Sequence, residues 1–211
     1  HLIQLDVDQF YGIEIEEFPA QIAQVALWLM DHQMNLQVSE EFGLYFARIP
    51  LSASSTIVCG NALRVDWNDV VPAEKLSFIM GNPPFSGAMV MSDDARKDLA
   101  HTFADLHGSG VLDFVACWYW LAAKYIGGTS IEVGFVSTNS VCQGEQVGII
   151  WPTILGKYNV KINFAHRTFK WSNEAKGRAA VHCIIIGFSV NEKSTKIICD
   201  YDKNDDAYHA I

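Results

Sequence analysis

The chain has 211 residues, half of them hydrophobic, which is enough to build a sizeable core and predicts a single domain over residues 1–211. No apolar run reaches the roughly 18 residues of a membrane span, and the first ten residues lack the basic and apolar regions of a signal peptide. We therefore expect a cytoplasmic protein with no membrane partner.

Charge and cysteine content narrow the possible partners. The net charge of −9 argues against nucleic acid, but residues 157–211 carry nine Lys and Arg against six Asp and Glu, so a polyanion should meet that part of the chain. The five cysteines are scattered, without the spacing of zinc or redox motifs. They predict buried, reduced thiols and no metal site. Nothing in the composition predicts an oligomeric state.

The first predicted elements are a strand over residues 10–15 (FYGIEI) and a helix that begins near residue 16 and carries apolar residues at helical spacing up to Met30. A polar link over residues 31–41 should follow. Glu14 falls at the carboxyl end of the strand, where open α/β sheets bind ligands, and its carboxylate can accept hydrogen bonds from two ribose hydroxyls. Alternatively, an acidic residue here complements the dipole of the following helix.

Two further strands also end in polar turns. The strand over Thr56–Cys59 is followed by Asn61, which can hydrogen-bond a base edge or simply stabilise its turn. Residues 76–81 have the bulk of a strand buried on both faces, and Gly81-Asn-Pro-Pro ends that strand abruptly. Asn82 precedes two prolines with fixed φ and no amide donor, so we expect a stiff turn that presents Asn82 and ends at Phe85.

The rest of the chain continues the alternation. Residues 92–107 should form a surface helix or a mobile loop, and helices are predicted over 111–126 and 143–155. Strands are predicted over 131–138, 160–165 and 179–190, with a basic aromatic loop over 166–178 and a solvated acidic tail. Pro152 should bend or end the last helix. The pattern predicts an α/β fold with a mostly parallel sheet and a late antiparallel hairpin at its edge.

The ordered set of motifs resembles the S-adenosylmethionine-dependent adenine-N6 DNA methyltransferases, and covers nearly the whole chain. Asn-Pro-Pro-Phe after a buried strand is similar to their catalytic motif, FYGIEI to their ribose-binding strand, and CGNAL (residues 59–63) to the strand whose exit holds the cofactor adenine. The segment 166–188 resembles in particular the large fused restriction-modification proteins of type IIG. The resemblance implies a Rossmann-like, doubly wound class I methyltransferase fold.

Site roles follow from this resemblance. The cofactor would be S-adenosylmethionine, bound by Glu14, Ile15, Asn61, Ala62 and Asn82. The catalytic residues would be Asn82, Pro83, Pro84 and Phe85. The Asn82 oxygen and the Pro83 carbonyl can accept hydrogen bonds from the adenine amine, whose lone pair is delocalised into the ring, and Phe85 can stack on the base.

The partner implied is double-stranded DNA, from which the target base must be flipped into the pocket. An aromatic ring of the 166–178 loop would pack on that base, with Trp171 favoured over Phe169, and the loop offers Lys170, Lys176 and Arg178 to phosphates. The alternative is that one ring covers the sheet edge and the lysines are solvated.

The chain also departs from the family pattern. The glycine-rich cofactor loop that family members place one strand before FYGIEI is absent, as is a target recognition domain after the last strand. The chain therefore resembles a piece of a larger methyltransferase, and we expect weak cofactor binding and no turnover by this piece alone. Asn61 stands where an acidic residue is more usual.

Two other functions remain open from the sequence. The acceptor could be a protein glutamine or RNA, although Phe85 in place of tyrosine favours DNA. The chain could instead be a catalytically dead DNA-binding scaffold.

Overall fold

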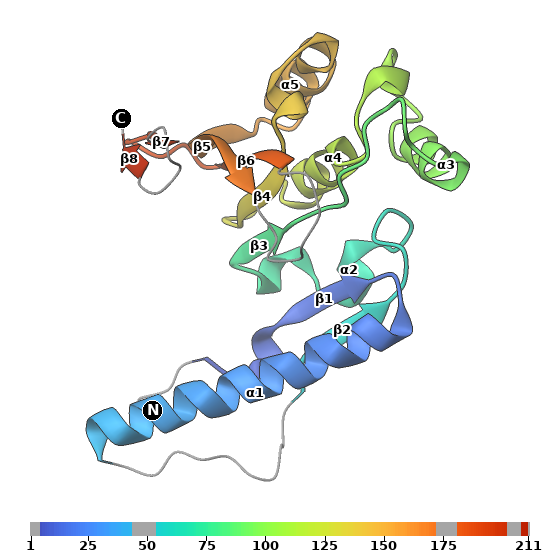
Figure 1. Cartoon of the computed structure of the whole chain (residues 1–211). Coiled ribbons are helices and arrows are strands. Elements are labelled where there is room, and N and C mark those ends of the chain that lie inside the picture. Colours follow the sequence, from blue (N-terminus) through green and yellow to red (C-terminus); the bar gives the residue numbers. More distant parts are fainter. Residues whose placement is uncertain (1–4, 44–53, 172–180, 202–207, 211) are drawn as a thin grey trace. The chain divides into compact units, whose positions relative to one another are not determined.

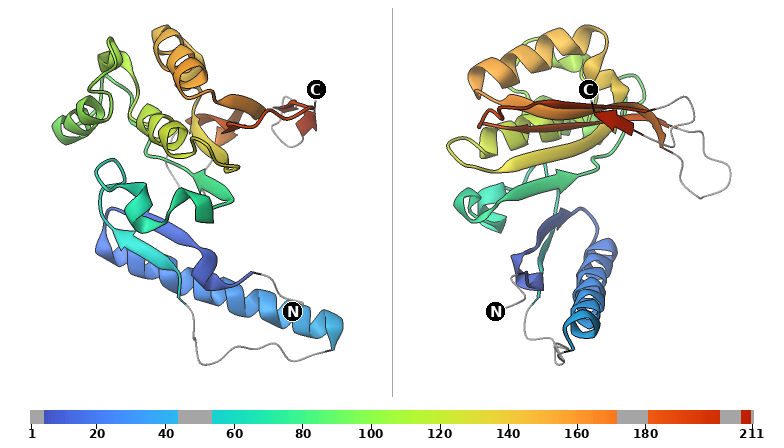
Figure 2. Two further views of the ribbon diagram at one scale, coloured as in Figure 1. Left: turned by 180° about the vertical axis from the view of Figure 1, so that it is seen from behind. Right: turned by 90° about the vertical axis from the view of Figure 1, so that its left-hand side faces the viewer.

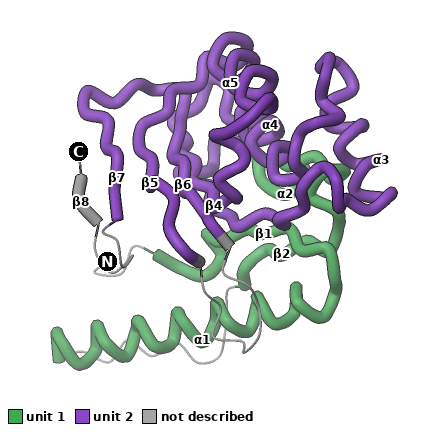
Figure 3. The backbone as a smooth tube through the Cα atoms, turned by 45° about the horizontal axis from the view of Figure 1, so that its top comes forward, with its two compact units in different colours: residues 1–72 green, residues 73–211 purple. Residues whose placement is uncertain are grey.

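The computed structural model describes residues 5–43, 54–171, 181–201 and 208–210 (Figure 1). For Trp171, Val181 and residues 208–210 it describes the backbone alone. Contacts divide the chain into two compact units, residues 1–72 (unit 1) and residues 73–211 (unit 2), coloured separately in Figure 3. Each unit is described by itself.

Unit 1 is a strand-helix-strand element. Its members are the short helix η1 (Val7–Gln9), β1 (Tyr11–Glu14), α1 (Glu17–Phe42), β2 (Thr56–Cys59) and α2 (Trp67–Val70). The two strands pair in parallel, with Glu14 opposite Cys59. Both strands were predicted within one residue of their observed bounds. The parallel pairing brings their carboxyl ends to one edge, because a helix connects them.

α1 is longer than predicted, and the polar link expected over residues 31–41 is wrong. The helix continues because this stretch lacks glycine and proline, and its polar residues bond within the helix. Asn35 Nδ2 donates to Asp31 Oδ2 at 2.9 Å, and Ser39 Oγ donates to the Asn35 carbonyl at 2.7 Å. Gly43 ends the helix with a φ of 65°, the left-handed conformation that glycine adopts without strain.

Unit 2 contains a six-stranded sheet in the order β3-β4-β6-β5-β7-β8. The strands are β3 (Phe78–Gly81), β4 (Glu132–Thr138), β5 (Lys161–Trp171), β6 (Val181–Ser189), β7 (Ile197–Tyr201) and β8 (Tyr208–Ala210). The pairs β3–β4 and β5–β7 are parallel, and β4–β6, β5–β6 and β7–β8 are antiparallel. The late antiparallel hairpin predicted from the sequence is confirmed as β5–β6, but its predicted place at the edge of the sheet is wrong, because β4 and β7 flank it.

The helices of unit 2 connect these strands, and α4 and α5 cover one face of the sheet (Figure 2). The helical elements are η2 (Ala73–Lys75), α3 (Asp93–Thr102), η3 (Ser109–Val111), α4 (Ala116–Tyr125), η4 (Asn139–Cys142) and α5 (Glu145–Lys157). The core forms where Tyr119 of α4 meets Phe135 of β4, Phe188 of β6 and Trp151 of α5, with ring centroids 5.3–5.8 Å apart. The α/β class expected from the sequence is confirmed.

Four local expectations for unit 2 are wrong. β5 runs through residues 166–171, which were predicted as a loop, because β6 offers partners as far as Val181. The predicted solvated tail contains β7 and β8. Pro152 does not end α5, which continues to Lys157, while the alternative that it bends the helix stays a prediction. Finally, Phe78 and Met80 of β3 are 67% and 85% exposed, so this strand is not buried on both faces. Among the described residues β3 pairs with β4 alone. One edge of the strand is therefore without a partner strand, and the face that carries Phe78 is exposed.

Among the described helices, none is long and apolar enough to cross a membrane.

Candidate active site

The Asn-Pro-Pro-Phe turn leaves unit 2 at the carboxyl end of β3, where the strand rests directly on the core. Gly81 lies opposite Phe135 in the parallel register, and a Cβ at Gly81 would sit 3.2 Å from two carbons of the Phe135 ring. Phe135 is 1% exposed and contacts Tyr119, so it has no room to move away. Glycine is therefore required for β3 to approach β4 this closely.

The turn itself presents its polar group outward. Asn82 is exposed, Pro83 is buried, Pro84 is exposed and Phe85 is half-buried. The two prolines provide no amide donor and fix their own φ, so the turn cannot relax by forming its own backbone hydrogen bonds. The exposed Asn82 amide can accept a hydrogen bond from a ligand, and its orientation depends on the segments on either side.

The predicted cofactor residues of unit 1 come together at the carboxyl edge of the β1–β2 pair. Glu14 Oε1 accepts from the amides of Ile15 at 2.8 Å and Glu16 at 3.5 Å, and hydrogen bonds among the described residues reach only this oxygen. Oε2 can therefore accept from a ligand. The Glu14 carbonyl also accepts from the Gly60 amide at 2.8 Å, which fixes the two strand ends together.

Asn61 makes the turn-stabilising contact that was one of its two predicted roles. Its Oδ1 accepts from the Leu63 amide at 2.9 Å, while its carbonyl accepts from the amides of Arg64 and Val65. The neighbouring Ala62 carbonyl accepts from Trp67 Nε1 at 2.9 Å, so this turn is tied to α2.

Three of the predicted DNA-facing residues, Phe169, Lys170 and Trp171, lie on β5, where a bulge between His166 and Phe169 changes the alternation of the strand. His166 pairs with Ile185 and Phe169 with Cys183, so the two side chains share a face of the sheet. Both contact Tyr201 of β7: His166 Nδ1 lies 2.7 Å from the Tyr201 hydroxyl, and the Phe169 and Tyr201 rings are 5.2 Å apart. Burial lowers the pKa of His166, so its ring is neutral near pH 7.

The other predicted DNA-facing residues are less defined. Lys170 is exposed on β5, and Trp171 ends that strand with its backbone alone described. Lys176 and Arg178 lie outside the described residues. The choice between Phe169 and Trp171 as the stacking ring thus stays a prediction.

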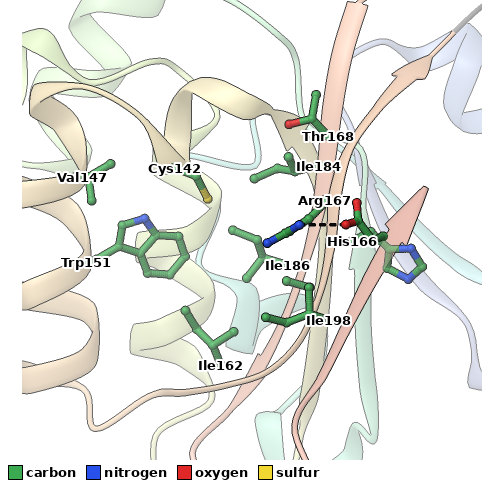
Figure 4. A pocket seen from close by; sticks show the side chains of 12 residues that line it. Cys142, Val147, Trp151, Ile162, His166, Arg167, Thr168, Ile184, Ile186 and Ile198 are labelled. Atoms are coloured by element: carbon green, nitrogen blue, oxygen red, sulfur yellow. Dashed lines mark hydrogen bonds and ion pairs between the residues drawn. The ribbon is translucent and has the colours of Figure 1, made fainter. Parts of the chain in front are cut away.

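Unit 2 also contains a cavity of about 650 Å³ that the sequence did not predict, between α5 and the strands β5, β6 and β7 (Figure 4). Its apolar wall includes Trp151, Ile184 and Ile186. Arg167 lies at this cavity and pairs with Asp200 at 2.7 Å. None of the predicted site residues lines it.

A polar turn at the end of a parallel strand, in an α/β unit whose late strands form an antiparallel hairpin, is the arrangement of a class I methyltransferase domain. Comparison with known proteins identifies the family. The chain belongs to the family described as "MmeI, DNA-methyltransferase domain", whose model matches residues 2–200. The DNA methyltransferase family recognised from the motifs is thereby confirmed.

Three relatives illustrate the relationship. DNA methyltransferase A of Bacillus subtilis (strain 168) is 40% identical over 185 residues, which cover 86% of this chain and 21% of the relative. The structure of the type IIL restriction-modification enzyme MmeI in complex with DNA is 56% identical, with a TM-score of 0.94 over 100% of this chain and 28% of that one. The type IIG restriction endonuclease BpuSI shares the fold, with a TM-score of 0.60 at 15% identity over 94% of this chain and 21% of that one. This chain therefore spans between a fifth and a third of each relative.

Proposed function

We propose that this chain is the catalytic domain that transfers a methyl group from S-adenosylmethionine to the N6 amino group of adenine in double-stranded DNA, within a larger restriction-modification protein. The observation that carries the proposal is the exposed Asn82 on a proline-stiffened turn whose strand is packed against Phe135. The type IIL enzyme of similar structure was solved bound to DNA, which supports DNA as the partner.

The chemistry of adenine explains why these residue types suit the task. The exocyclic nitrogen is a weak nucleophile, so a site can help by accepting hydrogen bonds from its hydrogens and by holding it in line with the methyl group. The Asn82 oxygen and the Pro83 carbonyl are two acceptors held in one rigid turn. Phe85 offers a ring against which the flipped base can stack.

The ends of β1 and β2 fit the nucleoside part of the cofactor, whose sulfonium supplies an activated methyl group. Glu14 has a carboxylate oxygen available for ribose hydroxyls, since its backbone contacts use Oε1. Ile15 follows it with a 65% exposed side chain, which can cover one face of an adenine ring. Asn61 and Ala62 lie at the neighbouring strand end. These four residues would hold the cofactor and orient it.

On the DNA side, we infer that a ring of β5 packs against the flipped adenine. Phe169 or Trp171 would take this role, and Lys170, Lys176 and Arg178 would contact phosphates. The open edge of β3 is consistent with a catalytic sheet that needs a further strand. We therefore expect the 211-residue chain alone to bind cofactor weakly and to be inactive.

The test uses the full-length protein with tritium-labelled S-adenosylmethionine and duplex DNA, RNA or protein as the acceptor, followed by mass spectrometry of the labelled product. We expect N6-methyladenine as the product, and a loss of at least about 100-fold in single-turnover rate for Asn82→Ala with DNA affinity nearly unchanged. Asn68→Ala, an exposed asparagine of α2, is the matched control and should behave as wild type. Label appearing in RNA or in protein glutamine, or wild-type turnover by Asn82→Ala, would refute the proposal.

A further inference from the structure

The segment that follows the catalytic turn is held by hydrogen bonds from other elements of unit 2. The Ser86 carbonyl accepts from the Phe114 amide at 2.9 Å. The Ala88 amide donates to Asp113 Oδ1 at 3.0 Å, and the Ala88 carbonyl accepts from Arg96 Nη2 of α3 at 2.9 Å. Both backbone polar groups of Ala88, its amide and its carbonyl, are therefore bonded to side chains. We call Arg96 and Asp113 the clasp.

Asp113 is itself anchored in the core. It follows Leu112 and precedes Phe114 and Val115, and both Leu112 and Val115 are 0% exposed. Its amide donates to Gln146 Oε1 of α5 at 3.2 Å, and its carbonyl accepts from the Ala116 amide as α4 begins. The carboxylate is thus fixed on the helix layer of unit 2, and a rigid acceptor positions its donor well.

The catalytic turn depends on such external anchors. Pro83 and Pro84 have no amide hydrogen, so half of the turn cannot hold itself through backbone donors. At its start, Gly81 rests on Phe135 at close contact. At its end, the clasp fixes Ala88, three residues after Phe85. The turn is therefore fixed at both sides, and its position relative to the sheet is set by these two contacts.

We propose that Asp113 and Arg96 are positioning residues for the methyl transfer: by holding the Ala88 peptide, they fix the angle at which Asn82 and Phe85 meet the target base. This inference rests on the proposed function of the turn. The clasp acts on the backbone and touches neither base nor cofactor in this proposal. Its loss should lower the rate of the chemical step and leave the binding of DNA and cofactor almost unchanged, because orientation contributes to the transition state.

The test compares variants of the full-length protein. Asp113→Leu removes the acceptor at similar size, and Asp113→Asn keeps an acceptor oxygen. Asp94→Leu is the matched control, because Asp94 is an exposed residue of α3 that pairs with Lys97. We expect Asp113→Leu to reduce the single-turnover rate about 10- to 100-fold, while the dissociation constants for DNA and cofactor stay within about threefold of the wild-type values. Asp113→Asn should recover most of the rate.

A second variant protects the test against misfolding. Arg96 is exposed, so Arg96→Met should fold, and it keeps the apolar stem while removing the donor to Ala88. We expect a rate loss of about three- to tenfold. Rates equal to the Asp94→Leu control for both Arg96→Met and Asp113→Leu would overturn the proposal. So would a loss that Asp113→Asn fails to recover.

Hydrogen exchange separates failure of the clasp from failure of the proposed function. Amide exchange at Ala88 in the full-length protein needs no substrate, and it should become at least about tenfold faster in Asp113→Leu than in Asp94→Leu. Unchanged exchange would overturn the clasp, whatever reaction the enzyme catalyses. Absence of N6-methyladenine with wild-type protein, together with accelerated exchange, would instead refute the adenine assignment and retain the clasp.

Discussion

Gly81→Ala tests the link between sheet packing and catalysis directly. The added Cβ would lie 3.2 Å from two ring carbons of Phe135, a separation that requires a few tenths of an ångström of movement. Phe135 is 1% exposed and packs edge-on against Tyr119 and Phe188, so the exposed strand β3 has to move instead. The turn over residues 82–85, for which we propose the catalytic role, begins one residue later and would move with the strand.

Two magnitudes follow. Overpacking costs about 1–3 kcal/mol, and the reduced entropy of the unfolded chain offsets about 0.4–1 kcal/mol, so the net loss of stability is up to about 2.6 kcal/mol. A misplacement of 1 Å can cost about 100-fold in rate, so if the logarithm of the rate scales with displacement, 0.3–0.5 Å costs about 4- to 10-fold.

The assay is single-turnover methylation by the full-length protein, with cofactor and DNA saturating. Gly134→Ala on β4 is the control, because its Cβ would meet only Phe164, at an ordinary 3.8 Å. The double variant Gly81→Ala with Phe135→Leu should recover part of the lost rate, since the smaller side chain leaves room. Equal rates for Gly81→Ala and Gly134→Ala would refute the reasoning.

Three further predictions concern the core and the cysteines. Tyr119→Phe removes a hydroxyl that lies 3.0 Å from Ser137 Oγ in a site where both residues are 0% exposed. The variant should lose about 1–2 kcal/mol in the free energy of unfolding, measured by denaturant titration. A stabilised variant would contradict this. Gly187→Ala would place a Cβ inside the Phe164 ring, so it should lower the melting temperature, and Phe164→Ala should suppress the effect in a double-mutant cycle; additive losses would contradict the clash. Burial raises the pKa of Cys117 to about 12, so its thiol stays protonated from pH 7 to 9. Iodoacetamide should therefore modify the exposed Cys59 in the folded protein and Cys117 only after unfolding. Peptide mapping of the modified protein would reveal this difference.

Much of the fold could be predicted because its strands carry strong local signals. The strand Thr56–Cys59 was predicted at its observed bounds, and the β-branched run of β6 and the helix α5 were found within a few residues. The motif Asn82 to Phe85 was also recognisable, since consecutive prolines after an apolar run restrict the backbone in a way visible in the sequence.

What the sequence missed depends on tertiary contacts. The extension of β5 past His166 requires the partner strand β6 and a bulge, and neither leaves a periodic signal in a polar stretch. The exposure of Phe78 and Met80 depends on which neighbours β3 has, not on their hydrophobicity. The role of Asp113 was hidden for a similar reason: its partner Ala88 is 25 residues away and is bonded through its backbone.

The clasp forms hydrogen bonds with backbone groups and not with side chains, so it places little restriction on the residue type at the position that it holds. The hydrogen bonds reach the Ser86 carbonyl and the Ala88 amide and carbonyl, which are all backbone groups. Many different side chains at these two positions are therefore compatible with the same hydrogen bonds. Proline at position 88 is the exception, because it has no amide hydrogen to donate to Asp113. Residues 86 and 88 can therefore vary in sequence while the turn over residues 82–85 keeps its conformation. A saturation library selected for methylation should tolerate most substitutions there, with Asp113 far more restricted.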